Sequence, residues 1–320
     1  MAKKDKILVI AEPDYSPIST VARATWLAQL YDCDVHLMLA DAPITVPGDG
    51  IFQSPEAQQI HDWILAEQQA MADELAMEAR DRGLTVKTEI LKKRPLAEAI
   101  LARADKLEPR FIVKATQYHS EADRAIFMHT DWRLIRAALH PLWLVKPHTM
   151  PEKPVILCAV DPTHAHDKTG KLDQVIVDAG LSLATHANGT VLLLHTFEAM
   201  EAIGEAAKFA LKPVRLPLRS LRAKVRKEHR QLLDQLATDN GIPRKNTHQL
   251  PGRPHEILPA FAHGKKADVV VMGAVARNRW KRLFIGATAE RTLEDLPCDL
   301  LIIKPDWFHT PVDLDKHEAA

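Results

Sequence analysis

A stretch near the C-terminal end of the chain has the residue types that bind phosphate, with glycines at a strand end and a helix start and arginines between them. These candidate binding residues are Gly273, Arg277, Arg279, Gly286, Ala287 and Thr288. A glycine after a strand permits positive φ and lets backbone N–H groups approach phosphate oxygens. Arginine contacts phosphate bidentately, and a helix N-terminus presents unpaired N–H groups. The segment therefore predicts an anion site, with a solvated charged loop as the alternative.

A histidine cluster raises the question of a metal site. His164 and His166 lie two residues apart beside Asp161 and Asp167. On an extended segment both rings point to one side and could hold a metal ion. Because one short cluster without a distant third ligand is a weak signal, we predict no metal site.

Catalytic motifs are missing from the sequence. It contains neither the GxSxG nucleophile elbow of hydrolases nor the GxxxxGK[ST] phosphate loop. No acid and base can be placed at reacting distance from sequence alone. We therefore expect no dedicated catalysis, and slow ATP hydrolysis stays open.

Composition restricts the class of protein. The 320 residues include 42 basic and 42 acidic side chains, so the net charge is zero and nucleic acid is not an expected partner. Any anion site must be local. No apolar run reaches the roughly 18 residues of a membrane span, and no signal peptide is recognisable, which predicts a cytoplasmic protein. The separated cysteines Cys33, Cys158 and Cys298 indicate reduced thiols.

The chain contains an internal repeat. PLWLVKP at 141–147 matches DLLIIKP at 299–305, and KILVIAEPD at 6–14 matches PVILCAVDPT at 154–163. In the second pair each apolar run ends in an acid followed by proline. These matches indicate that the chain contains two copies of one unit, which are similar in length.

The repeat defines the expected domains. A first domain covers 1–147, a proline-bearing linker follows, and a second domain covers 154–306. Residues 307–320 have the composition of a polar C-terminal tail.

Within each copy, five short apolar runs alternate with longer amphipathic segments. The runs are 7–11, 35–40, 86–91, 110–115 and 142–146 in the first copy, and 155–160, 190–195, 246–250, 268–273 and 300–304 in the second. Runs this apolar are typical of strands in a sheet covered on both faces. We therefore predict an α/β fold with two tandem, doubly wound parallel sheets.

The longest helix of each copy has recognisable boundaries. In the first copy Ser54 is an N-cap candidate, Pro55 opens the helix and Gly83 ends it; the counterpart covers 220–241. Four apolar residues of the first helix are expected to face the sheet: Trp63, Ile64, Met71 and Leu75.

The predicted topology adds one residue to the candidate site. In an open parallel sheet, ligands bind beyond the carboxyl ends of the strands, where the winding direction reverses. In the second copy this position brings Asp161, after the first strand, towards Gly273, after the fourth.

These motifs resemble the universal stress protein family. The resemblance rests on five strands per copy, VVVMGA before the loop, FIGATAE after it, FMHTDW in the first copy and KPDWFHTPVDLD at the end. The resemblance extends over essentially the whole chain, once in each copy. The two copies in one chain resemble the tandem-domain, bacterial E-type of the family.

The resemblance implies a Rossmann-like fold, similar to the adenine nucleotide alpha hydrolases, with strand order 3-2-1-4-5 and a fifth strand used in pairing. In one chain, Leu142–Lys146 would pair with Leu300–Lys304 and relate the halves by a pseudo-two-fold axis. A homodimer is a further expectation.

ATP-binding members of the family carry GxxG, nine further residues and G[ST], and place an acid near adenine and ribose, here Asp161. Gly273 and Gly286 match the first and third glycines with the correct spacing. Ala276 replaces the second glycine and Ala287 the hydroxyl residue, with Thr288 one place late. The anion site is therefore expected to be half retained.

The first copy departs further from this pattern. Ala115 stands where the second copy has Gly273, and Met128 stands where it has Gly286. The intervening loop carries Glu121. We therefore expect a vestigial pocket and a structural role for this half.

The expected function is a non-catalytic binding or signalling module in the stress response. One alternative is an ATP-gated switch, and another is a carrier or sensor of a larger phosphorylated or lipid-like ligand. No cofactor is predicted with certainty, and ATP or another phosphorylated small molecule is the candidate.

Overall fold

The computed structural model of the chain describes most of the repeat. Its described ranges are 4–40, 55–91, 95–116, 124–163, 171–197, 218–274 and 295–312. The chain divides into two compact units, the first comprising Met1–Thr149 with His309–Ala320 and the second Met150–Phe308.

The first unit is a parallel sheet with helices between its strands. Its elements are β1 (Lys6–Ala11), α1 (Pro17–Tyr31), β2 (Asp34–Leu39), α2 (Pro55–Asp81), β3 (Val86–Ile90), α3 (Leu96–Leu107), β4 (Phe111–Ala115), α4 (Arg124–Ala137) and β5 (Leu142–Val145). The strand order is β3-β2-β1-β4-β5, and every neighbouring pair is parallel.

The second unit repeats this topology. Its elements are β6 (Val155–Ala159), α5 (Leu172–Ala187), β7 (Thr190–Phe197), α7 (Leu218–Asp239), the 3-10 helix η1 (Arg244–Asn246), β8 (Thr247–Pro251), α8 (Pro254–Lys265), β9 (Val269–Gly273) and β10 (Asp299–Ile303). The order is β8-β7-β6-β9-β10, again with parallel neighbours.

The predicted fold class and strand order are confirmed in both units. The burial of the strands explains why the apolar runs predicted them. Every side chain of β4 is buried, and so are all but the first of β1, because helices cover both faces of the sheet. The outer strands β3 and β8 are only half buried and contain more polar residues.

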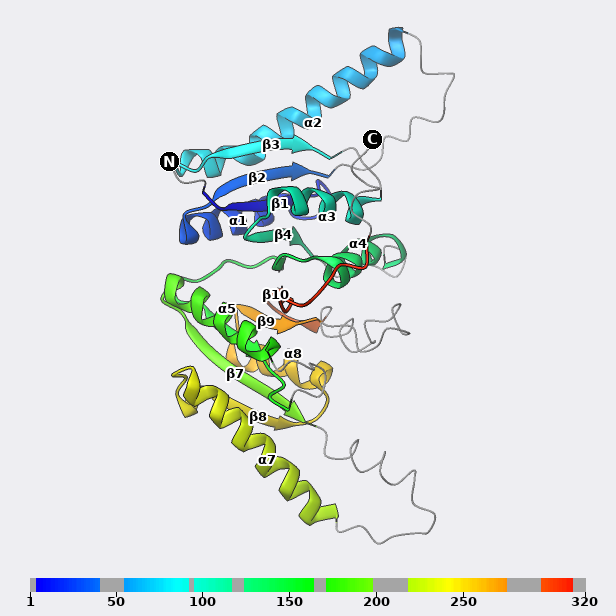
Figure 1. Cartoon of the computed structure of the whole chain (residues 1–320). Coiled ribbons are helices and arrows are strands. Elements are labelled where there is room, and N and C mark those ends of the chain that lie inside the picture. The colour runs from blue at the N-terminus through cyan, green and yellow to red at the C-terminus, as the bar shows by residue number, and fades with distance from the viewer. Residues whose placement is uncertain are drawn as a thin grey trace, which may run out of the picture. The chain divides into compact units, whose positions relative to one another are not determined.

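One expectation for α2 is wrong. Trp63 does not face the sheet, since 64% of its surface is exposed, and the buried residues of α2 are Ala72, Ala76 and Ala79. Helix α2 has 27 residues and β3 has five. They span about 40 Å and about 17 Å respectively, so only the C-terminal half of the helix covers the strands (Figure 1). Ile64, Met71 and Leu75 are partly buried.

Candidate functional site

The candidate site lies at the carboxyl edge of the second sheet. Strands β6 and β9 are parallel neighbours, with Ala159 opposite Met272. The next residues of both strands therefore meet at one edge, which brings the segment carrying Asp161 close to Gly273. In this order β6 and β9 flank the point where the winding reverses.

Asp161 is held by its neighbours and stays partly open. Its backbone N–H donates to the Asp173 carboxylate (2.8 Å), and its own carboxylate accepts a hydrogen bond from the Thr163 hydroxyl (2.6 Å). Its side chain is 38% exposed. The carboxylate is therefore oriented at the edge of the sheet and accessible to a ligand hydroxyl group.

A buried histidine pair next to Asp161 was missed by the sequence reasoning. His195, on β7, is 2% exposed, and its Nδ1 lies 3.1 Å from the Val160 carbonyl oxygen and 4.0 Å from Asp161 Oδ1. Its Nε2 lies 2.8 Å from Nδ1 of His229 on α7. The strand run ending in His195 could have drawn attention to it, but nothing in the sequence connects it with His229.

Burial lowers the pKa of both histidines. Desolvation is the main cause for His195 and for His229, although the Asp161 charge opposes it in both cases. Both rings are therefore neutral near pH 7. In the arrangement that satisfies every contact, His195 Nδ1–H donates to the Val160 carbonyl and His229 Nδ1–H donates to His195 Nε2.

Gly273 is required for a different reason from the one expected. Its φ lies outside the left-handed region, so the backbone does not need glycine for positive φ. A Cβ at this position would lie 2.6 Å from Cδ2 of Leu172, the first residue of α5. The glycine therefore allows α5 to begin close to the end of β9.

Lys304 is a second polar residue that the sequence reasoning did not assign to this edge. It follows β10, and its ammonium group donates to the Ala274 carbonyl oxygen and lies 4.4 Å from the centre of the Phe308 ring. Burial lowers the pKa of Lys304 to about 7. It is thus a half-buried amine beside the residue that follows Gly273.

The other predicted site residues lie outside the described residues. This applies to the binding candidates Arg277, Arg279, Gly286, Ala287 and Thr288, and to the histidine cluster. Within the described ranges, no three His, Cys, Asp or Glu side chains are grouped as metal ligands.

The same position in the first unit is closed by an ion cluster. Lys114, on β4, places its Nζ 2.5 Å from Glu12 Oε2 and 2.9 Å from Asp131 Oδ1, and all three side chains are buried. Its Nζ also donates to the Ala115 carbonyl oxygen at 3.1 Å. Burial alone would lower the pKa of Lys114, but the two carboxylates outweigh this effect and raise it.

The equivalence of the two positions follows from the register. Glu12 lies just beyond the end of β1, and Asp161 lies just beyond the end of β6. On the neighbouring strand, Lys114 is opposite Ile10 of β1 in the first unit. Met272 is opposite Ala159 of β6 at the matching place in the second unit. The cluster therefore stands at the switch point of the first sheet. It contains one cation and two carboxylates, which would repel a phosphate.

Two doubly wound parallel sheets, one closed at its switch point and one with an accessible acid there, define a tandem α/β protein with two unequal halves. The sequence profile of the Universal stress protein family matches residues 4–146 and 155–304, and the chain belongs to this family. Its role is accordingly in the stress response.

Individual relatives agree over the whole length. Universal stress protein E of Escherichia coli K12 is 26% identical over 99% of both chains, and that of Photorhabdus laumondii is 23% identical over 99% of this chain and 100% of its own. A functionally unknown protein from Pseudomonas aeruginosa PAO1 superposes with a TM-score of 0.65 at 23% identity, covering 95% of this chain and 93% of its own. The described helices include none long and apolar enough to cross a membrane.

Proposed function

We propose that the chain is a non-catalytic, cytoplasmic binding and signalling module in which the second half, 154–306, takes up a phosphorylated ligand and the first half, 1–147, has a structural role. The observation that carries this proposal is the difference between the two switch points. The first holds a buried, fully formed ion cluster, whereas the second holds a partly exposed carboxylate.

The closed state of the first half follows from charge and space. Lys114 is enclosed by Glu12 and Asp131, and its ammonium group also donates to a backbone carbonyl. A phosphate entering here would have to displace two carboxylates from a buried cation. Breaking such a cluster costs several kcal/mol, so this half should not hold a triphosphate.

The second half lacks the corresponding lysine, because Met272 stands at the matching position. Among the described residues Asp161 consequently has no ammonium partner, and its side chain remains 38% exposed. In ATP-binding members of the family, an acid at this place lies near the adenine and ribose. Arg277 and Arg279 would neutralise the phosphates of such a ligand, and Gly286, Ala287 and Thr288 would contribute backbone N–H groups if a helix begins there as the sequence predicts.

We propose that the ligand is a phosphorylated small molecule other than ATP. Relative to the pattern of ATP-binding members, Ala276 adds a methyl group where a ribose or phosphate approaches, and Ala287 lacks a hydroxyl donor. The arginines supply charge without restoring the backbone shape. ATP therefore serves as the comparison ligand in the test.

Calorimetric titration with pyrophosphate and with magnesium ATP tests this proposal. We expect saturable pyrophosphate binding that Arg277→Ala/Arg279→Ala weakens by about tenfold or more, since each arginine makes a charge-assisted contact. Lys224→Ala/Lys245→Ala removes the same charge from exposed positions elsewhere in the second unit and should leave the affinity unchanged. Equal loss in both variants, or no binding, would remove the loop from the account, and tighter binding of ATP would restore ATP as the ligand.

A further inference from the structure

A basic groove lies at the outer edge of the second unit, away from the switch point. It has a volume of about 1420 Å³ between α7 and the edge strand β8, and Glu256 is the one acidic residue among the described residues that line it. Its basic residues are Arg222, Arg226, Lys227, Arg230, Arg244 and Arg253. Strand β7 separates β8 from β6, and the ring of His195 lies between Asp161 and Phe197, which lines the groove.

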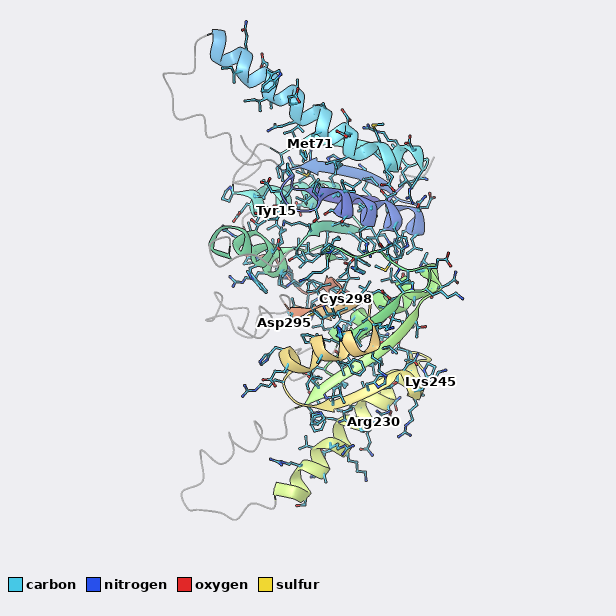
Figure 2. The ribbon with its side chains drawn as sticks, turned by 180° about the vertical axis from the view of Figure 1, so that it is seen from behind. Tyr15, Met71, Arg230, Lys245, Asp295 and Cys298 are labelled. Carbon is cyan, nitrogen blue, oxygen red and sulfur yellow. The ribbon has the colours of Figure 1, made fainter. Side chains whose placement is uncertain are left out.

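The basic side chains come from both walls of the groove. Arg222, Arg226 and Arg230 are spaced four residues apart on α7, which places them on one face at intervals of about 6 Å. Arg244 precedes β8 and Arg253 follows it. Arg230 and Lys245, labelled in Figure 2, mark α7 and the turn before β8. An extended anion in the groove would meet cations along its length.

Part of this charge has no ion-pair partner among the residues that the structure describes. Arg230 is held in place, since it donates to Asp234 and to the Thr247 carbonyl oxygen at 3.2 Å. In the described part of the chain, Arg226, Lys227 and Arg244 form no ion pair, and all three are exposed. Their charges are therefore available to a ligand.

The fold does not require a basic helix at this position. Helix α2 in the first unit is the counterpart of α7. Besides histidine, α2 carries seven acidic residues and one basic residue, whereas α7 carries six basic and three acidic residues. The chain as a whole has zero net charge. The groove is thus a local concentration of charge, and its role is specific to the second unit.

The groove favours a long ligand without aromatic bases. Its volume exceeds the roughly 300–1,000 Å³ of ordinary small-molecule pockets. Phe197 is the aromatic residue among the described lining residues, and it is 8% exposed and packs against the rings of His195 and His229. A single-stranded nucleic acid needs aromatic faces on which bases stack. We propose that this groove binds a linear oligophosphate.

The test compares inorganic polyphosphate binding to the intact chain and to two charge-matched variants. Arg226→Glu/Arg244→Glu reverses two exposed cations that line the groove. Lys224→Glu/Lys245→Glu reverses two exposed cations of the same elements that do not line it. In calorimetry we expect the first variant to lose affinity by about tenfold or more and the second to bind as the unmodified chain does, with an affinity that falls as salt rises.

Three results would overturn the proposal: no saturable binding, equal weakening in both variants, or displacement of polyphosphate by a single-stranded oligonucleotide at lower concentration. Circular dichroism and melting curves show that both variants are folded. Because Arg277→Ala/Arg279→Ala leaves all six basic residues that line the groove unchanged, it should not change polyphosphate affinity. Failure of this proposal is therefore distinguishable from failure of the proposed site at the switch point.

Discussion

At the residue scale, the two halves differ in the burial and the partners of the ionisable side chains at equivalent positions. Lys114 is fully enclosed by two carboxylates in the first unit, and in the second unit Asp161 neighbours a pair of neutral histidines. An enclosed ion cluster fixes its surroundings, whereas an accessible acid can meet a ligand. The unequal roles that we propose for the halves rest on these few side chains.

Replacing Lys114 tests the closed site. Lys114→Met leaves Glu12 and Asp131 buried without their cation, which should lower the free energy of unfolding by about 3–5 kcal/mol. Acid should recover part of this loss because the carboxyl groups become neutral. Urea unfolding at two pH values measures both effects. The control Glu12→Gln/Lys114→Met/Asp131→Asn removes all three charges and should be far more stable; a loss of similar size in both variants would contradict the role assigned to the cluster.

The histidine pair predicts a dependence of stability on pH. Burial lowers the pKa of His195 and of His229 in the native state, so the unfolded chain binds more protons as the pH falls below about 6.5. The stabilisation is present above that pH and is lost on acidification. His195→Gln should therefore show a smaller fall in unfolding free energy between about pH 7 and pH 5.

The matched control is His186→Gln, at an exposed position on α5. It should retain the pH dependence of the unmodified chain. Parallel curves for His195→Gln and the unmodified chain would show that the pair does not carry this effect.

At the element scale, the sequence predicts the strands well and the contacts between elements poorly. Five runs per copy place every strand. The inner strands are apolar because they are buried on both faces, whereas the half-buried outer strands β3 and β8 contain more polar residues. The exposure of Trp63 was not predictable, since it depends on how far α2 extends past the sheet. Likewise the sequence predicts that Lys114 lies in a strand, but it does not predict that Glu12 and Asp131, which are distant in the sequence, contact it.

Helix α5 offers a test of close packing. A Cβ on Gly180 would overlap the Cys158 sulfur on β6, so Gly180→Ala should destabilise the chain by about 1–3 kcal/mol although alanine favours helices. Gly264, on α8, has open space around it. Gly264→Ala should therefore stabilise by about 0.5–1 kcal/mol in the same unfolding measurement. Stabilisation by both changes would contradict the packing of α5 on β6.

At the scale of the whole molecule, the chain contains two copies of one fold, to which we assign different roles. The first copy retains the architecture with a closed switch point, and the second retains the accessible acid. The fifth strands of the two copies are the regions we expect to pair within one chain, as Leu142–Lys146 with Leu300–Lys304, because an unpaired strand edge invites association.

Hydrogen exchange tests that pairing. If the two fifth strands pair within one chain, the amides of Leu142–Lys146 and Leu300–Lys304 should be protected together in dilute, monomeric protein. Light scattering establishes the monomeric state. Fast exchange of alternate amides on both strands, or protection that appears only as a homodimer forms, would show that the edges pair between chains or stay open.

We propose that the second switch point takes up the ligand and that the first does not. Hydrogen–deuterium exchange of the intact chain, with and without saturating pyrophosphate, distinguishes the two positions. We expect slower exchange around Asp161 and Gly273 and no change around Glu12 and Ala115. Protection around Glu12 and Ala115, or no protection at either position, would contradict this proposal.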